Sequence, residues 1–347
     1  MENKWQAFES ATQLAIARDV ALRRYSSLGI GGFAAGALTA ESEQALEKIW
    51  RTAESLGIVV KMLGGGTNVV FTDDGFDGLL VRLGENFKKI EARTQTSGSG
   101  LRAGAAVHLT ALITRSMELG LSGLEKLAGI PGTLGGAIYQ NSGARDYEIG
   151  CAVASVTFLD AAQKKIRTIR GPELQFGYRT SCFKNLRAVI LSAELDLKPD
   201  SREAIMAEVN ARMKHRGVTQ PTGRSIGCIF KNAEGASAGQ WIDQAGLKGR
   251  RVGGLVVSDL HGNFFLNDGR ATFKDFEELV ALVRSEVQKK FGVILELEVE
   301  IVRANPTSAN VEGGAPHGST RGADTPRERV EDRSPRRWKI SGEGNFI

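Results

Sequence analysis

A chain of 347 residues with 41% hydrophobic and 24% charged content is typical of a globular protein of two or three domains. No apolar run approaches the roughly 18 residues that a membrane span needs, and residues 1–10 lack the basic and then apolar pattern of a secretory signal. The net charge of +5 comes from scattered Lys and Arg, and aromatic residues are few. We therefore expect no nucleic-acid partner and no membrane insertion.

The chain contains three cysteines, Cys151, Cys182 and Cys228, which are far apart in the sequence. Their odd number and wide spacing indicate neither a disulfide framework nor a zinc site. Free thiols are typical of a reducing compartment. We therefore expect a cytoplasmic protein that holds no metal, and we expect it to be a monomer.

The first half of the chain alternates helices, short strands and glycine-rich loops. Apolar residues at helical spacing predict a helix over 41–56 that Gly57 ends, and a second helix over 109–119. Short apolar runs predict strands, which lie at 58–63, 69–71, 79–83 and 152–160.

The second half begins with a predicted helix over 202–216 that links to a further unit. Apolar runs and periodicity predict the elements of this unit: strands at 254–257 and 264–266, an amphipathic helix over 273–291 and an alternating strand over 293–302. From Ala304 onward apolar residues are rare, which predicts a disordered tail over 304–347.

Two glycine-rich loops, 64–68 and 129–136, are candidates for binding an anion. The first lies between two predicted strands and therefore fits neither a Rossmann fingerprint nor a P-loop. Successive glycines let backbone N–H groups converge on an anion, so the pair favours a cofactor with a diphosphate. The cofactor-binding candidates are Gly64, Gly65, Gly66, Thr67, Asn68, Gly129, Ile130, Pro131, Gly132, Gly135, Gly136 and Asn141.

The hexapeptide Gly227-Cys228-Ile229-Phe230-Lys231-Asn232 carries the most specific chemical signal. A thiol with a pKa near 8.5 is mostly protonated at pH 7 and can still release its proton, which suits a proton donor to a carbanion. The alternative is a small buried hydrophobic residue. A thiol that serves this reaction is expected to be open to alkylation unless substrate covers it. Cys182 is the rival thiol.

Seven segments carry a family resemblance, in the family's order: 63–68 (LGGGTN), 129–137 (GIPGTLGGA), 177–181 (GYRTS), 227–232 (GCIFKN), 238–249 (AGQWIDQAGLKG), 261–267 (HGNFFLN) and 295–299 (LELEV). The set is similar to the UDP-N-acetylenolpyruvoylglucosamine reductases and covers roughly residues 20–303. The short segment between Ser181 and Arg212 resembles the class without the tyrosine-bearing loop. The chain departs from the family at Cys228, where serine is usual, and at Leu297, where proline is usual.

The resemblance implies an α+β chain with a vanillyl-alcohol-oxidase-like FAD-binding fold. The FAD-binding domain is expected over 1–200, in subdomains of about 1–88 and 89–200, and the C-terminal substrate domain over 201–303. It also implies non-covalent FAD, NADPH as reductant, and a UDP-sugar substrate. The implied reaction reduces the enolpyruvyl ether of UDP-N-acetylenolpyruvoylglucosamine to UDP-N-acetylmuramate for peptidoglycan synthesis.

The resemblance also implies roles for individual residues. Cys228 would donate a proton, while Arg179 and Glu298 would stabilise the enolate. The substrate-binding candidates are Lys231, Asn232 and Asn263. Strand alternation puts Glu296 and Glu298 on one face, so periodicity does not choose between them. Two other functions stay open, an FAD-dependent alcohol oxidase of the same fold and a non-catalytic nucleotide-binding module.

Overall fold

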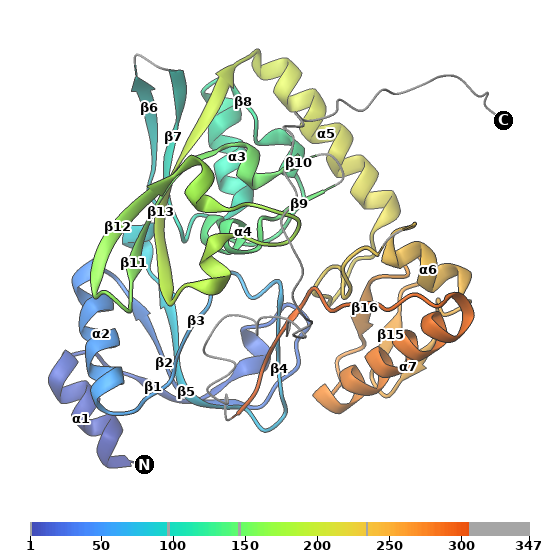
Figure 1. Ribbon diagram of the computed structural model, residues 1–347, viewed down its shortest axis with the longest axis horizontal. Coiled ribbons are helices and arrows are strands. Elements are labelled where there is room, and N and C mark those ends of the chain that lie inside the picture. Colours follow the sequence, from blue (N-terminus) through green and yellow to red (C-terminus); the bar gives the residue numbers. More distant parts are fainter. Residues whose placement is uncertain (1, 96–97, 145–146, 234, 305–347) are drawn as a thin grey trace, which may run out of the picture. The chain divides into compact units, whose positions relative to one another are not determined.

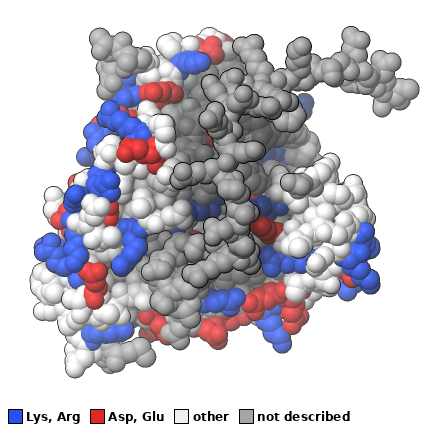
Figure 2. Space-filling model, in the orientation of Figure 1, with Lys and Arg blue, Asp and Glu red and all other residues white. Residues whose placement is uncertain are grey.

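The computed structural model describes residues 2–95, 98–144, 147–233 and 235–304 (Figure 1). The tail expected over 304–347 lies outside the described residues, apart from Ala304. No helix in the described part of the chain is both long and apolar enough to cross a membrane. Figure 2 shows Lys and Arg interspersed with Asp and Glu over the visible face.

The N-terminal sheet has four strands, in the order β1 (Ala17–Ala21), β2 (Phe33–Ala40), β5 (Phe76–Leu83) and β3 (Val60–Met62). The strands β2, β5 and β3 are parallel, and β1 is antiparallel to β2. Alternation along β5 gives the sheet two buried faces, since Leu79 and Val81 belong to one apolar cluster and Leu80 to another.

Two helices pack on the Leu79 face of this sheet, α1 (Glu2–Thr12) and α2 (Glu43–Ser55). They contribute Trp5, Phe8, Leu46 and Ile49 to its apolar cluster. The helix expected over 41–56 begins later because Ser42 is its N-cap, with a side-chain oxygen that accepts from the N–H of Ala45.

The second sheet is antiparallel, in the order β12 (Lys165–Arg170), β11 (Val153–Asp160), β13 (Ala188–Pro199), β7 (Gly98–Gly104) and β6 (Ile90–Gln95), and β8 (Leu121–Ser122) pairs with β13. The helices α3 (Leu109–Glu118) and α4 (Leu134–Gln140) share its apolar core. A short hairpin, β9 (Gly143–Ala144) and β10 (Tyr147–Glu148), follows α4. The 3-10 helices of the chain are η1 (Leu22–Arg24), η2 (Glu85–Phe87), η3 (Glu125–Leu127), η4 (Ile149–Cys151), η5 (Gly171–Leu174) and η6 (Cys182–Asn185).

The helix α5 (Arg202–Thr219) leads into the C-terminal region, where α6 (Ala238–Gln244) and α7 (Phe273–Phe291) pack with a small antiparallel sheet. The sheet consists of β14 (Arg251–Val252), β15 (Leu255–Val257) and β16 (Phe265–Asn267). The last strand, β17 (Glu300–Val302), leaves this region and pairs in parallel with β4 (Val69–Phe71). The end of the described chain therefore returns to the strand that follows the first glycine loop.

The helix expected over 273–291 and the strand over 69–71 match α7 and β4. The strand expected over 293–302 is too long, because only Glu300–Val302 forms a strand. Just before β17, Leu297 makes a single bridge to Phe230. The extended segment therefore pairs first with Phe230 and then with β4, and not with one long strand. The domain boundaries near residues 88, 200 and 303 stay predictions.

Candidate active site

Arg179 lies in a tight turn with an unusual backbone conformation. The N–H of Thr180 donates to the carbonyl of Gly177 over 3.0 Å, and Arg179 has a φ of 55°. This left-handed conformation costs an ordinary residue roughly 1–2 kcal/mol, and the third position of such a turn favours glycine. A strained arginine at this position is consistent with a functional requirement for its side chain.

The guanidinium of Arg179 reaches across to the last segment of the described chain. Its Nε donates to Oε1 of Glu298 over 2.6 Å, and its Nη2 donates to the carbonyl of Gly143 over 3.2 Å. Both charged side chains are largely buried, with 15% of Arg179 and 12% of Glu298 exposed. The planar fork of the guanidinium satisfies two acceptors in fixed directions, so Glu298 holds Arg179 in one orientation.

Glu298 is fixed through its own backbone. Its N–H donates to the carbonyl of Ile229 over 2.9 Å, and its carbonyl accepts from Nδ2 of Asn68 over 3.2 Å. Burial raises the pKa of the Glu298 carboxyl, although Arg179 acts in the opposite direction. The carboxyl therefore keeps its proton to higher pH than an ordinary glutamate.

The structure separates the two glutamates that alternation leaves equivalent. The Glu296 side chain is 69% exposed and pairs with Nζ of Lys231 over 3.1 Å, whereas Glu298 is buried against Arg179. Of these two glutamates only Glu298 therefore lies beside the strained arginine, whose Nη1 also lies 4.0 Å from Oε1 of Glu148.

Cys228 follows Gly227, which has a φ of 81°, and makes a single bridge to Phe264. Burial and the nearby Glu298 raise the pKa of the Cys228 thiol to about 12, while Arg179 and Arg216 act to lower it. The thiol is therefore protonated at neutral pH. The raised pKa argues against ready alkylation of the protein without ligands, since the thiolate is the reactive form.

Asn263 supports the Cys228 segment instead of facing an open site. The side chain is buried, and it accepts from the N–H of Phe230 over 2.9 Å and donates to the carbonyl of Phe230 over 2.8 Å. It also hydrogen-bonds the Cys228 thiol, which acts to lower the thiol pKa. His261 is structural here, because its Nδ1 accepts from the N–H of Asn263 over 3.2 Å.

Asn232 and Lys231 continue the same segment toward Tyr178. The N–H of Asn232 donates to the hydroxyl of Tyr178 over 3.0 Å, and its side-chain oxygen accepts from the N–H of Ala238. The ring of Tyr178 lies under the Arg179 guanidinium, 5.1 Å from its centre. The Lys231 ammonium is partly exposed, whereas the Arg179 guanidinium is largely buried, so Lys231 is the more accessible cation for a substrate anion.

The two glycine loops lie against each other. A Cβ built on Gly65 would come within 3.0 Å of the Gly132 Cα, and one on Gly132 would come within 3.0 Å of Oγ1 of Thr67. In the described part of the chain, the backbone N–H groups of residues 64–68 have no protein acceptor. Unpaired donors beside side-chain-free backbone fit the phosphates of a bound FAD.

The cofactor-binding candidates of the second glycine loop are partly exposed and partly packed against the core. Gly129, Pro131 and Gly136 are exposed, whereas Gly135 packs so closely that a Cβ would lie 2.9 Å from that of Ala105. Ile130 packs on the core of the second sheet.

Asn141 is engaged with protein groups and not with the loops. It has a φ of 49°, and its Nδ2 donates to the carbonyl of Gly177 over 2.9 Å and to Glu148 over 2.6 Å. Asn141 therefore supports the turn that carries Arg179.

Sequence reasoning missed Arg216, which lies in the last turn of α5. A Cβ on Gly129 would come within 2.5 Å of the Arg216 Cδ, and its charge acts on the Cys228 thiol. Its Nη1 donates to the neutral Oε1 of Gln220 over 3.0 Å, and no carboxylate of the described residues lies within 4 Å. Burial lowers the pKa of this guanidinium. The helical pattern gives no signal for it.

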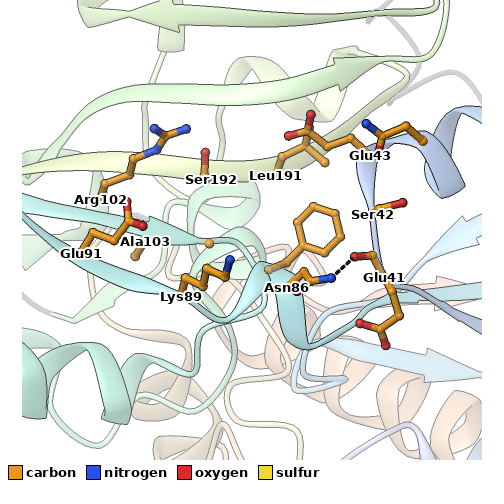
Figure 3. A pocket seen from close by; sticks show the side chains of 13 residues that line it. Glu41, Ser42, Glu43, Asn86, Lys89, Glu91, Arg102, Ala103, Leu191 and Ser192 are labelled. Carbon is orange, nitrogen blue, oxygen red and sulfur yellow. Dashed lines mark hydrogen bonds between the residues drawn. The ribbon is translucent and has the colours of Figure 1, made fainter.

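The rival thiol and a separate pocket lie outside this constellation. Cys182 is buried in the core of the second sheet, and burial raises its thiol pKa to about 11. A pocket of about 390 Å³ lies between α2 and the second sheet, with Lys89, Arg102 and Glu91 among its lining residues (Figure 3). None of Arg179, Cys228 and Glu298 lines it.

In the described part of the chain, no cluster of three or more His, Cys, Asp or Glu could hold a metal.

Comparisons with known families match two parts of the chain. The family described as FAD binding domain matches residues 34–169, and the family described as UDP-N-acetylenolpyruvoylglucosamine reductase, C-terminal domain, matches residues 220–302. Fold and site thus define a flavin-dependent oxidoreductase.

Relatives cover most of the chain. UDP-N-acetylenolpyruvoylglucosamine reductase 2 of Symbiobacterium thermophilum is 36% identical over 292 residues, which is 84% of this chain and 93% of the relative. The reductase of Desulfosudis oleivorans is 37% identical over 82% of this chain and 93% of its own. The crystal structure of the reductase from Thermus caldophilus has a TM-score of 0.70 at 34% identity, over 83% of this chain and 99% of that chain.

The chain belongs to the UDP-N-acetylenolpyruvoylglucosamine reductase family. Membership confirms the expected FAD-binding domain, which an α+β C-terminal domain follows. FAD is the cofactor, and NADPH is the reductant of this family.

Proposed function

We propose that this protein reduces the enolpyruvyl ether of UDP-N-acetylenolpyruvoylglucosamine to UDP-N-acetylmuramate, with NADPH as reductant, in the synthesis of a peptidoglycan precursor. The observation that carries the proposal is the contact of Arg179 with Glu298, which lies beside Cys228 and is tied to the first glycine loop through Asn68. A cytoplasmic location and a monomeric state go with this proposal as predictions.

The proposed reaction needs a carrier of two electrons and a separate proton. FAD, which the two glycine loops would hold without a covalent bond, would supply such a two-electron carrier between NADPH and an activated double bond. The net change places a hydride on the terminal carbon of the enolpyruvyl group and a proton on its internal carbon, with NADPH oxidised to NADP⁺. The protein must therefore stabilise charge beside the carboxylate and deliver that proton.

Cys228 is the proposed proton donor. Its Sγ–H bond breaks as the new C–H bond forms at the internal carbon, and solvent later restores the proton to the thiolate. A thiol held at a pKa of about 12 keeps its proton at neutral pH, and a carbanion beside a carboxylate is basic enough to take it. The positive charges of Arg179 and Arg216 favour the thiolate that this step leaves behind.

Arg179 and Glu298 are the proposed stabilisers of the enolate. The guanidinium offers fixed N–H donors to the growing oxygen charge. A negative carboxylate would oppose that charge, but burial favours the protonated form of Glu298. A neutral carboxyl can accept from Arg179 on one oxygen and donate its own proton from the other, as buried carboxylic acids do in other enolate-forming sites.

The diphosphate of the substrate needs cations that are not already neutralised. Arg216 has a neutral side-chain partner, Gln220, and Lys231 pairs with the exposed Glu296. Both border the Cys228 segment, so we assign them to the substrate anion. Asn232 and Asn263 then shape this segment through the contacts of their side chains with Ala238 and Phe230.

The proposal is tested with the purified flavoprotein under anaerobic conditions. NADPH should bleach the flavin band, and UDP-N-acetylenolpyruvoylglucosamine should restore it with formation of UDP-N-acetylmuramate. In deuterated water one deuterium should appear at the internal carbon, because the Cys228 thiol exchanges with solvent. A flavin that an alcohol reduces, and that this substrate does not reoxidise, would instead support the oxidase.

A further inference from the structure

Lys184 is a partly buried cation that the reaction described above does not use. It lies in η6, and its Nζ donates to the backbone carbonyl of Arg179 over 2.6 Å. Its ammonium also lies 5.9 Å from the ring centre of Tyr139. No carboxylate of the described residues lies within 4 Å of it. The lysine is therefore committed to one backbone acceptor instead of an ion pair.

That acceptor is the carbonyl of the strained residue. Arg179 has a φ of 55°. Among the described residues, the peptide that follows it is held by the turn hydrogen bond from Thr180 and by Lys184 alone. Other turn conformations without positive φ compete with this one. A rotation of this peptide would turn the Arg179 side chain away from Glu298.

The ammonium of Lys184 also contributes charge to the site. The groups whose charges act on the Glu298 carboxyl are Arg179, Lys184 and Lys231, and all three act to lower its pKa against the effect of burial. The thiol of Cys228 faces the same carboxyl. Burial and the neighbouring Lys231 lower the pKa of Lys184 itself.

We propose that Lys184 is a positioning residue for substrate reduction, which holds the carbonyl of Arg179 so that the guanidinium stays against Glu298. The proposal rests on the proposed function, because its main readout is the reoxidation of reduced flavin by substrate. In the proposed reaction Arg179 acts on the enolate and not on hydride entry from NADPH. Loss of Lys184 should therefore affect the two half-reactions unequally.

The test compares Lys184→Met with Lys290→Met in the holoenzyme. Lys290 is a matched control, because its Nζ donates to the backbone carbonyl of Ala245 at the end of α6. Lys184→Met should leave flavin content and flavin reduction by NADPH near the wild-type values. Reoxidation by substrate should slow by about tenfold to a hundredfold, as small misplacements of catalytic groups do. Lys184→Arg, which keeps the charge and a donor, should recover part of the rate.

Two further readouts separate positioning from a general loss of stability. The amide of Thr180 should exchange its hydrogen faster in Lys184→Met, while Lys290→Met leaves it unchanged. We expect the rate of reoxidation to fall at alkaline pH as Glu298 loses its proton. Because the Lys184 ammonium acts to lower the Glu298 pKa, its removal should move this fall to higher pH.

The proposal on Lys184 is overturned if Lys184→Met reoxidises at the wild-type rate, or if Lys290→Met shows the same selective loss. Unchanged exchange at Thr180 would also overturn it, and this readout needs no substrate. If NADPH reduces the wild-type flavoprotein but the UDP-sugar does not reoxidise it, the proposed function is contradicted instead. The exchange at Thr180 would then still decide whether Lys184 holds the turn.

Discussion

The side-chain amide of Asn68 donates a hydrogen bond to the backbone carbonyl of Glu298 over 3.2 Å. The same segment pairs further on, where β17 joins β4 in parallel. The residue that ends the first glycine loop therefore sets the position of a carboxyl that comes 230 residues later. The first glycine loop and the proposed enolate site are thus connected by a direct hydrogen bond and by the pairing of β17 with β4.

Asn68→Ala should lower the rate of the substrate half-reaction by about tenfold, because the segment that carries Glu298 loses one of its supports. Flavin reduction by NADPH should change less. Asn86→Ala is the matched control, since its Nδ2 also donates to a backbone carbonyl, that of Glu41 over 2.8 Å, outside the two glycine loops. Stopped-flow absorbance at the flavin band measures both steps. Equal effects of the two variants would contradict the coupling.

Arg179→Lys should reduce turnover by about 10²- to 10³-fold, as the loss of an electrostatic donor does. A point charge cannot reach Glu298 and the carbonyl of Gly143 together as the guanidinium does. The temperature of unfolding should change little, because lysine keeps the charge beside Glu298. Arg93→Lys is the matched control, since Arg93 also bridges two acceptors, Glu194 and Asp196, on the second sheet. Near-normal steady-state turnover of Arg179→Lys would show that the Arg179 guanidinium is not needed to stabilise the enolate.

Glu298→Gln should keep more activity than Glu298→Ala, because an amide also donates a hydrogen bond. The wild-type rate of substrate reduction should fall as pH rises through the elevated pKa of Glu298, since the neutral form is the donor. The Gln variant should lose that alkaline limb. Glu296→Gln, at an exposed site, should keep the limb. Rates of reoxidation against pH check all three.

The elements with strong local signals could be predicted from the sequence. The helix α7 has a regular apolar stripe and a capping residue, Thr272, and its bounds match the expected ones. The strand β4 is a short apolar run after glycines. Local patterns could not give the length of the last strand, because Leu297 pairs with Phe230 and Glu300 with Val69. Those partners are distant in the sequence.

The site residues that belong to a sequence motif could be predicted, but those that the packing of distant segments brings to the site could not. Segment order pointed to Arg179, Cys228 and Glu298, but alternation left Glu296 equal to Glu298 until burial separated them. Nothing in the helical pattern marks Arg216, which reaches Gly129 only through the folded chain. The raised pKa of Cys228 likewise depends on burial and on Glu298, neither of which is visible along the sequence.

Alkylation of Cys228 should be slow at pH 7–8 and should keep rising with pH well above 9. The pKa near 12 lies well above that of an ordinary thiol, so the thiolate fraction at neutral pH is very small. The measurement uses the Cys151→Ser, Cys182→Ser background, in which Cys228 is the remaining cysteine. Arg216→Gln should slow the reaction further, because this cation acts to lower the thiol pKa. A rate that levels off near pH 9 would show an ordinary thiol.

The thiol of Cys228 should behave as the proton donor of the substrate half-reaction. Cys228→Ser should retain substantial activity, because a hydroxyl in this position can donate as the family's usual serine does. Cys228→Ala should still let NADPH reduce the flavin, since hydride entry needs no side-chain proton. It should slow reoxidation by substrate by roughly 10²- to 10⁴-fold, as is typical when a general acid is removed.

Cys182→Ala is the control for this prediction, because that thiol is buried in the core of the second sheet. It should lower stability without a selective effect on reoxidation. Stopped-flow spectra separate the two half-reactions in each variant. Because Asn263 fixes Phe230 and not Cys228 alone, the alanine variant should keep the segment in place, so a loss of rate reports the missing proton. If Cys228→Ala reoxidised at the wild-type rate, Cys228 would be only a packed thiol, and a bound water would be the next donor to test.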